Sequence, residues 1–145
     1  MTVPGKPSTL IKPKLDTKFH IDYSWWDRHP TDDLRSYLLT HLLPEQRQYI
    51  NQLDQNQTID YIDPDTGEVT RLDQLQLYIR EAAQDPNFIN PHTSLVDSVF
   101  RVFLANGNLP QTPRQLAEQT GRDAQTILRT LGGPRIYKGI RPKLD

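Results

Sequence analysis

The strongest constraint in this sequence is a complete set of helix boundary signals between residues 112 and 121. Thr112 precedes Pro113, and Gln115 stands three positions after Thr112, so the segment contains a Thr-x-x-Gln capping box with proline in the first helical position. Gly121 then supplies the positive φ that ends a helix in a left-handed turn. The sequence therefore predicts a short helix with both ends defined.

A helix is also predicted on each side of this one. The preceding helix begins near Thr93 or Ser94 and stops at Asn106-Gly107, and the following helix is capped by Asp123 and stops at Gly132-Gly133. Each carries apolar residues at helical spacing, which indicates one buried face. These residues are Leu95, Val96, Val99, Phe100, Phe103 and Leu104 in the first helix, and Ala124, Ile127, Leu128 and Leu131 in the other.

Residues 112–131 resemble the helix-turn-helix DNA-binding motif of TetR-type repressors. The resemblance is carried by Ala117, Gly121 and Ile127. Alanine lets the two helices approach closely, glycine makes the sharp turn, and isoleucine fills the angle between the helices. The similarity covers these twenty residues directly, and about fifty when the supporting helix is included.

Two positions depart from the pattern of that family. Arg122 occupies a turn position that the family usually fills with Val or Leu, and Thr130 stands where many relatives carry an apolar residue, although Leu131 can substitute for it. The resemblance implies a three-helix DNA-binding domain at residues 91–145, with a recognition helix around residues 123–131.

The polar side of the last predicted helix is cationic. Arg122, Gln125 and Arg129 recur at helical spacing opposite the apolar face. In a major groove, the Gln125 side chain can pair with adenine, and the arginines can contact guanine or phosphate. Arg114 and the threonines near the starts of the helices are placed for contacts to phosphates. The predicted nucleic-acid contacts are Thr112, Arg114, Arg122, Gln125, Thr126, Arg129, Arg135, Tyr137, Lys138 and Arg141.

The tail from Pro134 to Lys143 alternates basic and apolar residues. One interpretation is a wing-like strand or an arm that follows the phosphate backbone. The other is a strand packed by Ile136 and Ile140, with its basic side chains in solvent. The sequence leaves both open.

The front of the chain predicts an arm followed by a small α+β region. The first sixteen residues interleave prolines with lysines, which indicates an extended arm. Residues 58–62 and 68–72 flank a turn containing Pro and Gly and predict a β-hairpin, which the alternating residues 19–23 are expected to join as a third strand. Helices are predicted after Thr31, from Pro44 and after Asp73, and at least one of Trp25 and Trp26 is expected in the core.

Together these elements predict an α+β protein that is mostly helical. Residues 1–16 form the arm, residues 17–90 a small α+β front half with a hairpin or three-stranded sheet, and residues 91–145 a helix-turn-helix domain with a basic tail. The formal net charge of −1 is unevenly distributed: residues 1–24 carry +2, residues 25–96 carry −7, and residues 97–145 carry +4. A basic end suits nucleic acid, although a basic tail is also compatible with simple solvation.

Several function classes are disfavoured. The 145 residues include no Cys, which excludes disulfides and thiolate zinc sites and fits a reducing cytosol. The four His are scattered, and no phosphate-cradling loop, nucleophile elbow or HExxH motif is present, so neither metal, cofactor nor catalysis is expected. Neither a membrane-spanning apolar run nor a signal peptide is apparent, so we expect a cytoplasmic protein without a membrane partner.

The leading hypothesis is a DNA-binding protein that regulates transcription by contacting double-stranded DNA through the helix around residues 123–131. A single motif contacts only a few base pairs, so a homodimer or a protein partner is expected, with the acidic front half as the candidate assembly surface. The alternative is a protein–protein adaptor or structural component of a larger complex, whose basic ends become ordered on their neighbours. RNA binding is a third option.

Overall fold

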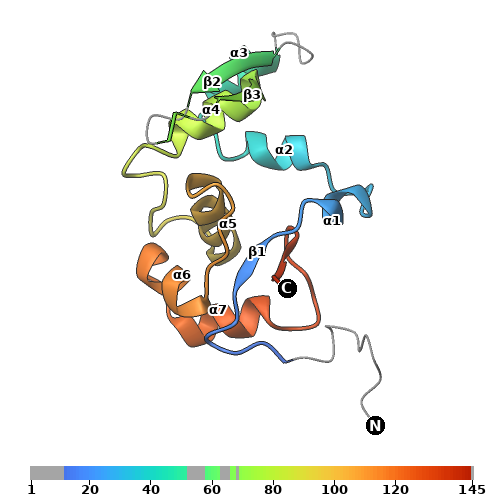
Figure 1. Cartoon of the computed structure of the whole chain (residues 1–145), viewed down its shortest axis with the longest axis vertical. Coiled ribbons are helices and arrows are strands. Elements are labelled where there is room, and N and C mark those ends of the chain that lie inside the picture. The colour runs from blue at the N-terminus through green and yellow to red at the C-terminus, as the bar shows by residue number, and fades with distance from the viewer. Residues whose placement is uncertain (1–11, 52–57, 63–65, 68, 145) are drawn as a thin grey trace. The chain divides into compact units, whose positions relative to one another are not determined.

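A computed structural model describes residues 12–51, 58–62, 66–67 and 69–144 (Figure 1). The fold is α+β, with mostly helices and, among the described residues, two antiparallel sheets of two strands each. The chain divides into two compact units: unit 1 comprises Met1–Pro30 and Ile89–Asp145, and unit 2 comprises Thr31–Phe88. This division differs from the predicted one, because residues 17–30 belong with the C-terminal helices and not with the front half.

Unit 1 is organised around a strand from the front of the chain. Its elements are β1 (Phe19–Ile21), α1 (Ser24–Asp27), α5 (Leu95–Ala105), α6 (Pro113–Thr120), α7 (Ala124–Leu131) and β4 (Ile140–Pro142). β1 pairs antiparallel with β4, and Phe19 also forms a bridge with Gln111, just before α6. The expectation that residues 19–23 join the hairpin of residues 58–72 is therefore wrong, because that backbone pairs with β4 (Figure 1).

The core of unit 1 is rich in aromatic residues. Trp25 and Trp26 are 7% and 5% exposed, so both lie in the core, where at least one of them was expected. Their rings meet edge to face at a centroid distance of 5.1 Å, and Trp26 meets Phe100 in the same way at 6.4 Å. The other buried apolar side chains come from both strands and all three long helices: Phe19, Ile21, Val99, Val102, Phe103, Leu116, Ile127, Leu131 and Ile140.

The predicted boundaries of α5, α6 and α7 are present as hydrogen bonds. The Thr112 hydroxyl accepts from the Gln115 N–H at 3.2 Å, and Gln115 Oε1 accepts from the Thr112 N–H at 2.9 Å, which confirms the capping box. Ser94 and Asp123 cap the other two helices through their side chains. Gly121 adopts φ 71° after α6, as its predicted left-handed turn requires. α6 packs against both α5 and α7.

Unit 2 is a small α+β unit with its own core. Its elements are α2 (Leu34–Leu39), α3 (Pro44–Asn51), β2 (Thr58–Ile62), β3 (Val69–Asp73) and α4 (Gln74–Ala82). β2 and β3 pair from Thr58 opposite Asp73 to Ile62 opposite Val69, which confirms the hairpin, although turn residues 63–65 and 68 lie outside the described residues. Among the side chains of this unit that the structure describes, the buried apolar ones are Leu42, Ile50, Leu75, Ile79 and Phe88.

The start of α2 differs from the sequence expectation. The cap of α2 is Asp33 and not Thr31, because the Asp33 carboxylate accepts from the N–H of Ser36 at 3.3 Å. His41, which follows α2, is buried at 6% exposure. Of the predicted arm, residues 1–11 lie outside the described part of the chain.

Candidate nucleic-acid interface

α7 separates an apolar face from an exposed polar one. Ile127 and Leu131 are buried, whereas Gln125 and Arg129 are exposed and lie one helical turn apart. The short turn through Gly121 fixes the direction of α7 relative to α6. Two long polar side chains therefore lie next to each other on the outer surface of a helix whose other side is anchored in the core.

A hydrogen-bond network occupies the first two turns of α7. The Asp123 carboxylate accepts from both the N–H and the hydroxyl of Thr126 at 2.9 Å, and Arg129 Nη2 donates to the Thr126 hydroxyl at 3.3 Å. The backbone and side-chain hydrogen bonds of Thr126 hold the pKa of the Asp123 carboxyl below its usual value. Thr126, which was predicted to contact phosphate, thus lies beside a carboxylate that repels phosphate.

Arg122 makes a tertiary contact within unit 1. Its guanidinium donates to the main-chain carbonyl of Thr93, and its own N–H donates to the Thr120 hydroxyl at 3.3 Å. The side chain is half-buried. Arg122 therefore connects the turn before α7 to the loop before α5, which gives a physical reason for an arginine at a position where the resemblance leads one to expect Val or Leu.

The predicted contacts at the start of α6 differ in availability. Thr112 is engaged in the capping box described above. Arg114 Nε lies 3.2 Å from Asp16 Oδ1, with the two side chains 62% and 86% exposed. Ion pairs this exposed contribute little to stability, so Arg114 can exchange Asp16 for a phosphate at small cost.

Part of the tail forms the packed strand that was one of the two interpretations of its sequence. Residues 140–142 form β4 with Ile140 buried, and Ile136 is half-buried. Arg141 Nη1 lies 3.2 Å from Asp22 Oδ2. Upstream, the Arg135 guanidinium stacks on Tyr137 at 4.9 Å from the ring centroid, and Lys138 Nζ lies 5.9 Å from the ring of Trp26. Arg135 is the exposed one of these cations.

Asp22 is the anionic centre of the β1–α1 junction. Its carboxylate accepts from the Ser24 hydroxyl at 2.6 Å and pairs with Arg28 at 3.6 Å as well as with Arg141. Burial raises its pKa, but the hydrogen bonds from Ser24 and the charges of Arg141 and Arg28 outweigh that effect, and the net pKa lies below its usual value. Asp22 therefore connects α1 to the C-terminal strand.

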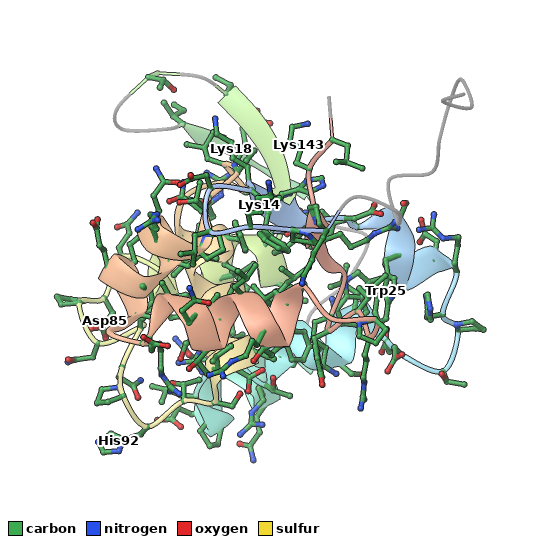
Figure 2. The ribbon with its side chains drawn as sticks, turned by 90° about the horizontal axis from the view of Figure 1, so that it is seen from below. Lys14, Lys18, Trp25, Asp85, His92 and Lys143 are labelled. Carbon is green, nitrogen blue, oxygen red and sulfur yellow. The ribbon has the colours of Figure 1, made fainter. Side chains whose placement is uncertain are left out.

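On the other strand face, sequence reasoning predicted Arg141 as a contact but missed the basic residues Lys18, His20 and Lys143 beside it. Lys18, His20, Arg141 and Lys143 share the face of the β1–β4 pair opposite the buried residues, and we call them the basic ribbon face. Figure 2 shows Lys14, Lys18 and Lys143 grouped on one side of the molecule, far from His92. The basic charge at both chain ends was a signal for this face, but pairing between the ends was not readable from sequence.

A pocket of about 340 Å³ lies where the C-terminal end of α7 meets these strands. Pro13 lies against it, and its Cβ is 3.4 Å from the position that a Cβ on Gly132 would take. The pocket is mostly apolar, with Arg141 as its charged residue. The arm, the last turn of α7 and β4 are therefore neighbours.

The two units carry opposite charge. By sequence, unit 1 has thirteen Lys and Arg against seven Asp and Glu, a net charge of +6, whereas unit 2 has four against eleven, a net charge of −7. The candidate interface thus belongs to a strongly basic unit, although the whole chain is close to neutral. Positive potential of this kind attracts polyanions.

No protein-family model matches the chain, and comparisons with curated proteins and with solved structures find no significant match. Within the described ranges, no group of three His, Asp or Glu side chains is arranged to hold a metal ion. Among the helices of the same ranges, none has the length and apolar character needed to cross a membrane.

Proposed function

We propose that unit 1 binds double-stranded DNA and that the protein regulates transcription. The observation that carries this proposal is the exposed pair Gln125 and Arg129 on α7, in a unit with a net charge of +6. In the proposal, α6 and α7 act as a helix-turn-helix, with α5 as the supporting helix and α7 as the recognition helix.

The two exposed side chains suit direct contacts to base edges. The Gln125 amide can donate to and accept from the major-groove edge of adenine, and the Arg129 guanidinium can donate two hydrogen bonds to guanine or contact a phosphate. Arg129 is held near Thr126 by a single 3.3 Å hydrogen bond, so turning toward a base costs little.

Five of the other predicted contacts divide into two groups. Arg114 and Arg135 are exposed and suit phosphates, because phosphate contacts need charge more than fixed geometry. Arg122, Thr112 and Thr126 instead maintain the fold around α6 and α7, through the hydrogen bonds described above. The contact surface proposed for bases is therefore narrower than the sequence alone suggested.

The test is fluorescence anisotropy with a labelled duplex of mixed sequence spanning about two helical turns. The variant Gln125→Ala/Arg129→Ala is compared with Gln76→Ala/Arg80→Ala, which removes the same residue pair at the same spacing from α4 of unit 2. We expect the α7 variant to lose at least about tenfold in affinity, since each base contact contributes roughly 1–3 kcal/mol, while the α4 variant binds normally. Equal affinities, or equal losses, would contradict the proposal.

A second function, protein–protein contact, is favoured by unit 2. Ile62 and Val69 are 64% and 60% exposed and lie opposite each other on the hairpin, and Leu43 and Tyr49 are 60% and 49% exposed. Ile62 and Val69 are direct cross-strand neighbours, and contiguous exposed apolar surface is typical of a site that contacts protein. Light scattering of Ile62→Thr/Val69→Thr checks this role: a lower mass than that of the unchanged chain supports self-association through the hairpin.

A further inference from the structure

The basic ribbon face brings cations from both ends of the chain onto one two-stranded surface. His20 lies directly opposite Arg141, and the Lys143 N–H donates to the Lys18 carbonyl at 2.8 Å, which extends the same pairing by one residue. Residues alternate between the two faces of a strand, so the burial of Phe19, Ile21 and Ile140 leaves these four side chains on the outer face.

This arrangement places like charges at neighbouring positions. Directly opposed side chains in an antiparallel pair have Cβ atoms about 5 Å apart, and like charges at that distance destabilise the pair. Lys18 and Lys143 occupy one such pair, and the next pair contains Arg141. Asp22 lies at the other end of the strands and contacts Arg141 and Arg28. The two lysines therefore lie at the end of the strand pair that is farther from Asp22.

We propose that the basic ribbon face binds backbone phosphates of the same DNA duplex that α7 contacts, an inference that rests on the proposed function. Lysine side chains are compact and flexible cations that suit phosphate oxygens without selecting a base sequence. The pKa of His20 lies below its usual value, first because the imidazole is partly buried and then because Lys143 and Arg141 are near, while Asp22 opposes these effects.

The ribbon lies close enough to α7 for one duplex to contact both. Pro13 packs beside Gly132 at the end of α7, and Leu131, Arg141 and Leu144 line the same pocket. Arg129 lies two residues before Leu131, so the helix proposed to contact DNA and β4 both border this pocket. In this proposal, the paired strands β1 and β4 contribute to the affinity for DNA, and α7 determines the sequence preference.

The test is the salt dependence of duplex affinity for Lys18→Gln/Lys143→Gln. Both side chains are exposed, and the hydrogen bond between these residues is main chain to main chain, so the fold is retained. The control, Arg35→Gln/Arg47→Gln in unit 2, removes the same charge from the chain. We expect the slope of log K against log salt to become shallower by about 2, and affinity at about 50 mM salt to fall about tenfold or more, in the ribbon variant alone.

The outcomes separate this inference from the proposed function. An unchanged slope in the ribbon variant, or the same change in the control, overturns the inference, whether or not the Gln125 and Arg129 variants lose binding. A shallower slope in the ribbon variant together with normal binding by the α7 variant supports the ribbon and overturns α7 as the recognition helix. Absence of duplex binding by the unchanged chain overturns both.

Discussion

The guanidinium of Arg122 donates a hydrogen bond to the main-chain carbonyl of Thr93, which lies 29 residues earlier in the chain. The contact joins the turn before α7 to the loop before α5, so it fixes two of the three helices of the candidate interface. An arginine that the sequence marks as a DNA contact thus has a role within the fold.

Replacing Arg122 is expected to lower stability. We predict that Arg122→Ala reduces the free energy of unfolding by about 1–2 kcal/mol, because a hydrogen bond from a charged donor to a half-buried carbonyl is lost. Arg129→Ala, which removes an exposed arginine from α7, is the control and is expected to change stability by less than about 0.5 kcal/mol. Urea denaturation measures both, and equal stabilities of the two variants would show that the Thr93 contact is not maintained.

The turn between α6 and α7 depends on Gly121. Its φ of 71° is strained for any residue with a Cβ, so Gly121→Ala is expected to cost about 1–2 kcal/mol of unfolding free energy. Gly133→Ala is the control, because a Cβ there meets only the Arg129 carbonyl at 3.4 Å, an ordinary contact distance. Thermal unfolding distinguishes them: the Gly121 variant melts several degrees lower, and an unchanged Tm would contradict the described turn.

Asp22 predicts a specific pH dependence of stability. Its pKa in the folded chain lies below the usual 3.8, so its contribution is complete above that value and is lost as pH falls through the lower folded pKa. Asp22→Asn is expected to cost about 1–2 kcal/mol near neutral pH, where it weakens the contacts to Ser24 and Arg141. The difference from the unchanged chain should shrink below about pH 4 in urea titrations, and a constant difference across that range would contradict the assignment.

His20 predicts a pH dependence of DNA binding. Its pKa in the free chain lies below 6.5, owing first to burial and then to Lys143 and Arg141, with Asp22 opposing. A bound phosphate favours the imidazolium, so binding takes up a proton and affinity rises as pH falls from about 7.5 toward 6. His20→Gln should remove part of this rise, whereas His92→Gln, far from the lysine group in Figure 2, should retain it. An identical pH profile for both variants would exclude His20 from the contact.

The helix boundaries of the C-terminal half were predictable because they depend on local chemistry. Thr112, Gln115 and Gly121 act on backbone groups within a few residues of themselves, and the structure shows those hydrogen bonds and that φ. The hairpin of residues 58–73 was predictable for the same reason, since its pairing follows from alternation on each side of one turn. Signals of this kind need no knowledge of the rest of the fold.

The long-range contacts were not predictable from local patterns. The pairing of Ile21 with Ile140 joins segments from opposite ends of the chain, and an alternating pattern shows that a strand exists without naming its partner. The assignment of β1 to the hairpin failed for this reason. The cap of α2 illustrates a smaller ambiguity, since Thr31 and Asp33 both suit an N-cap and only the hydrogen bond to Ser36 selects Asp33.

The candidate site also contains some residues that local patterns placed correctly and others whose positions depend on long-range contacts. Helical spacing was sufficient to place Gln125 and Arg129 on the exposed side of α7, opposite Ile127. Spacing also placed Arg122 there, but its partner Thr93 comes from a loop brought near by tertiary packing. The lysines of the basic ribbon face were not predicted as contacts, because the sequence does not show that β1 and β4 pair.

Duplex binding by the basic unit 1 is tested by measuring the affinity of the full chain for a mixed-sequence duplex across salt concentration. Counterion release predicts that log K falls linearly with log salt, with a slope steeper than about −3 between about 50 and 200 mM. Absence of binding at about 50 mM salt, or an affinity that does not change with salt, would contradict DNA binding by unit 1.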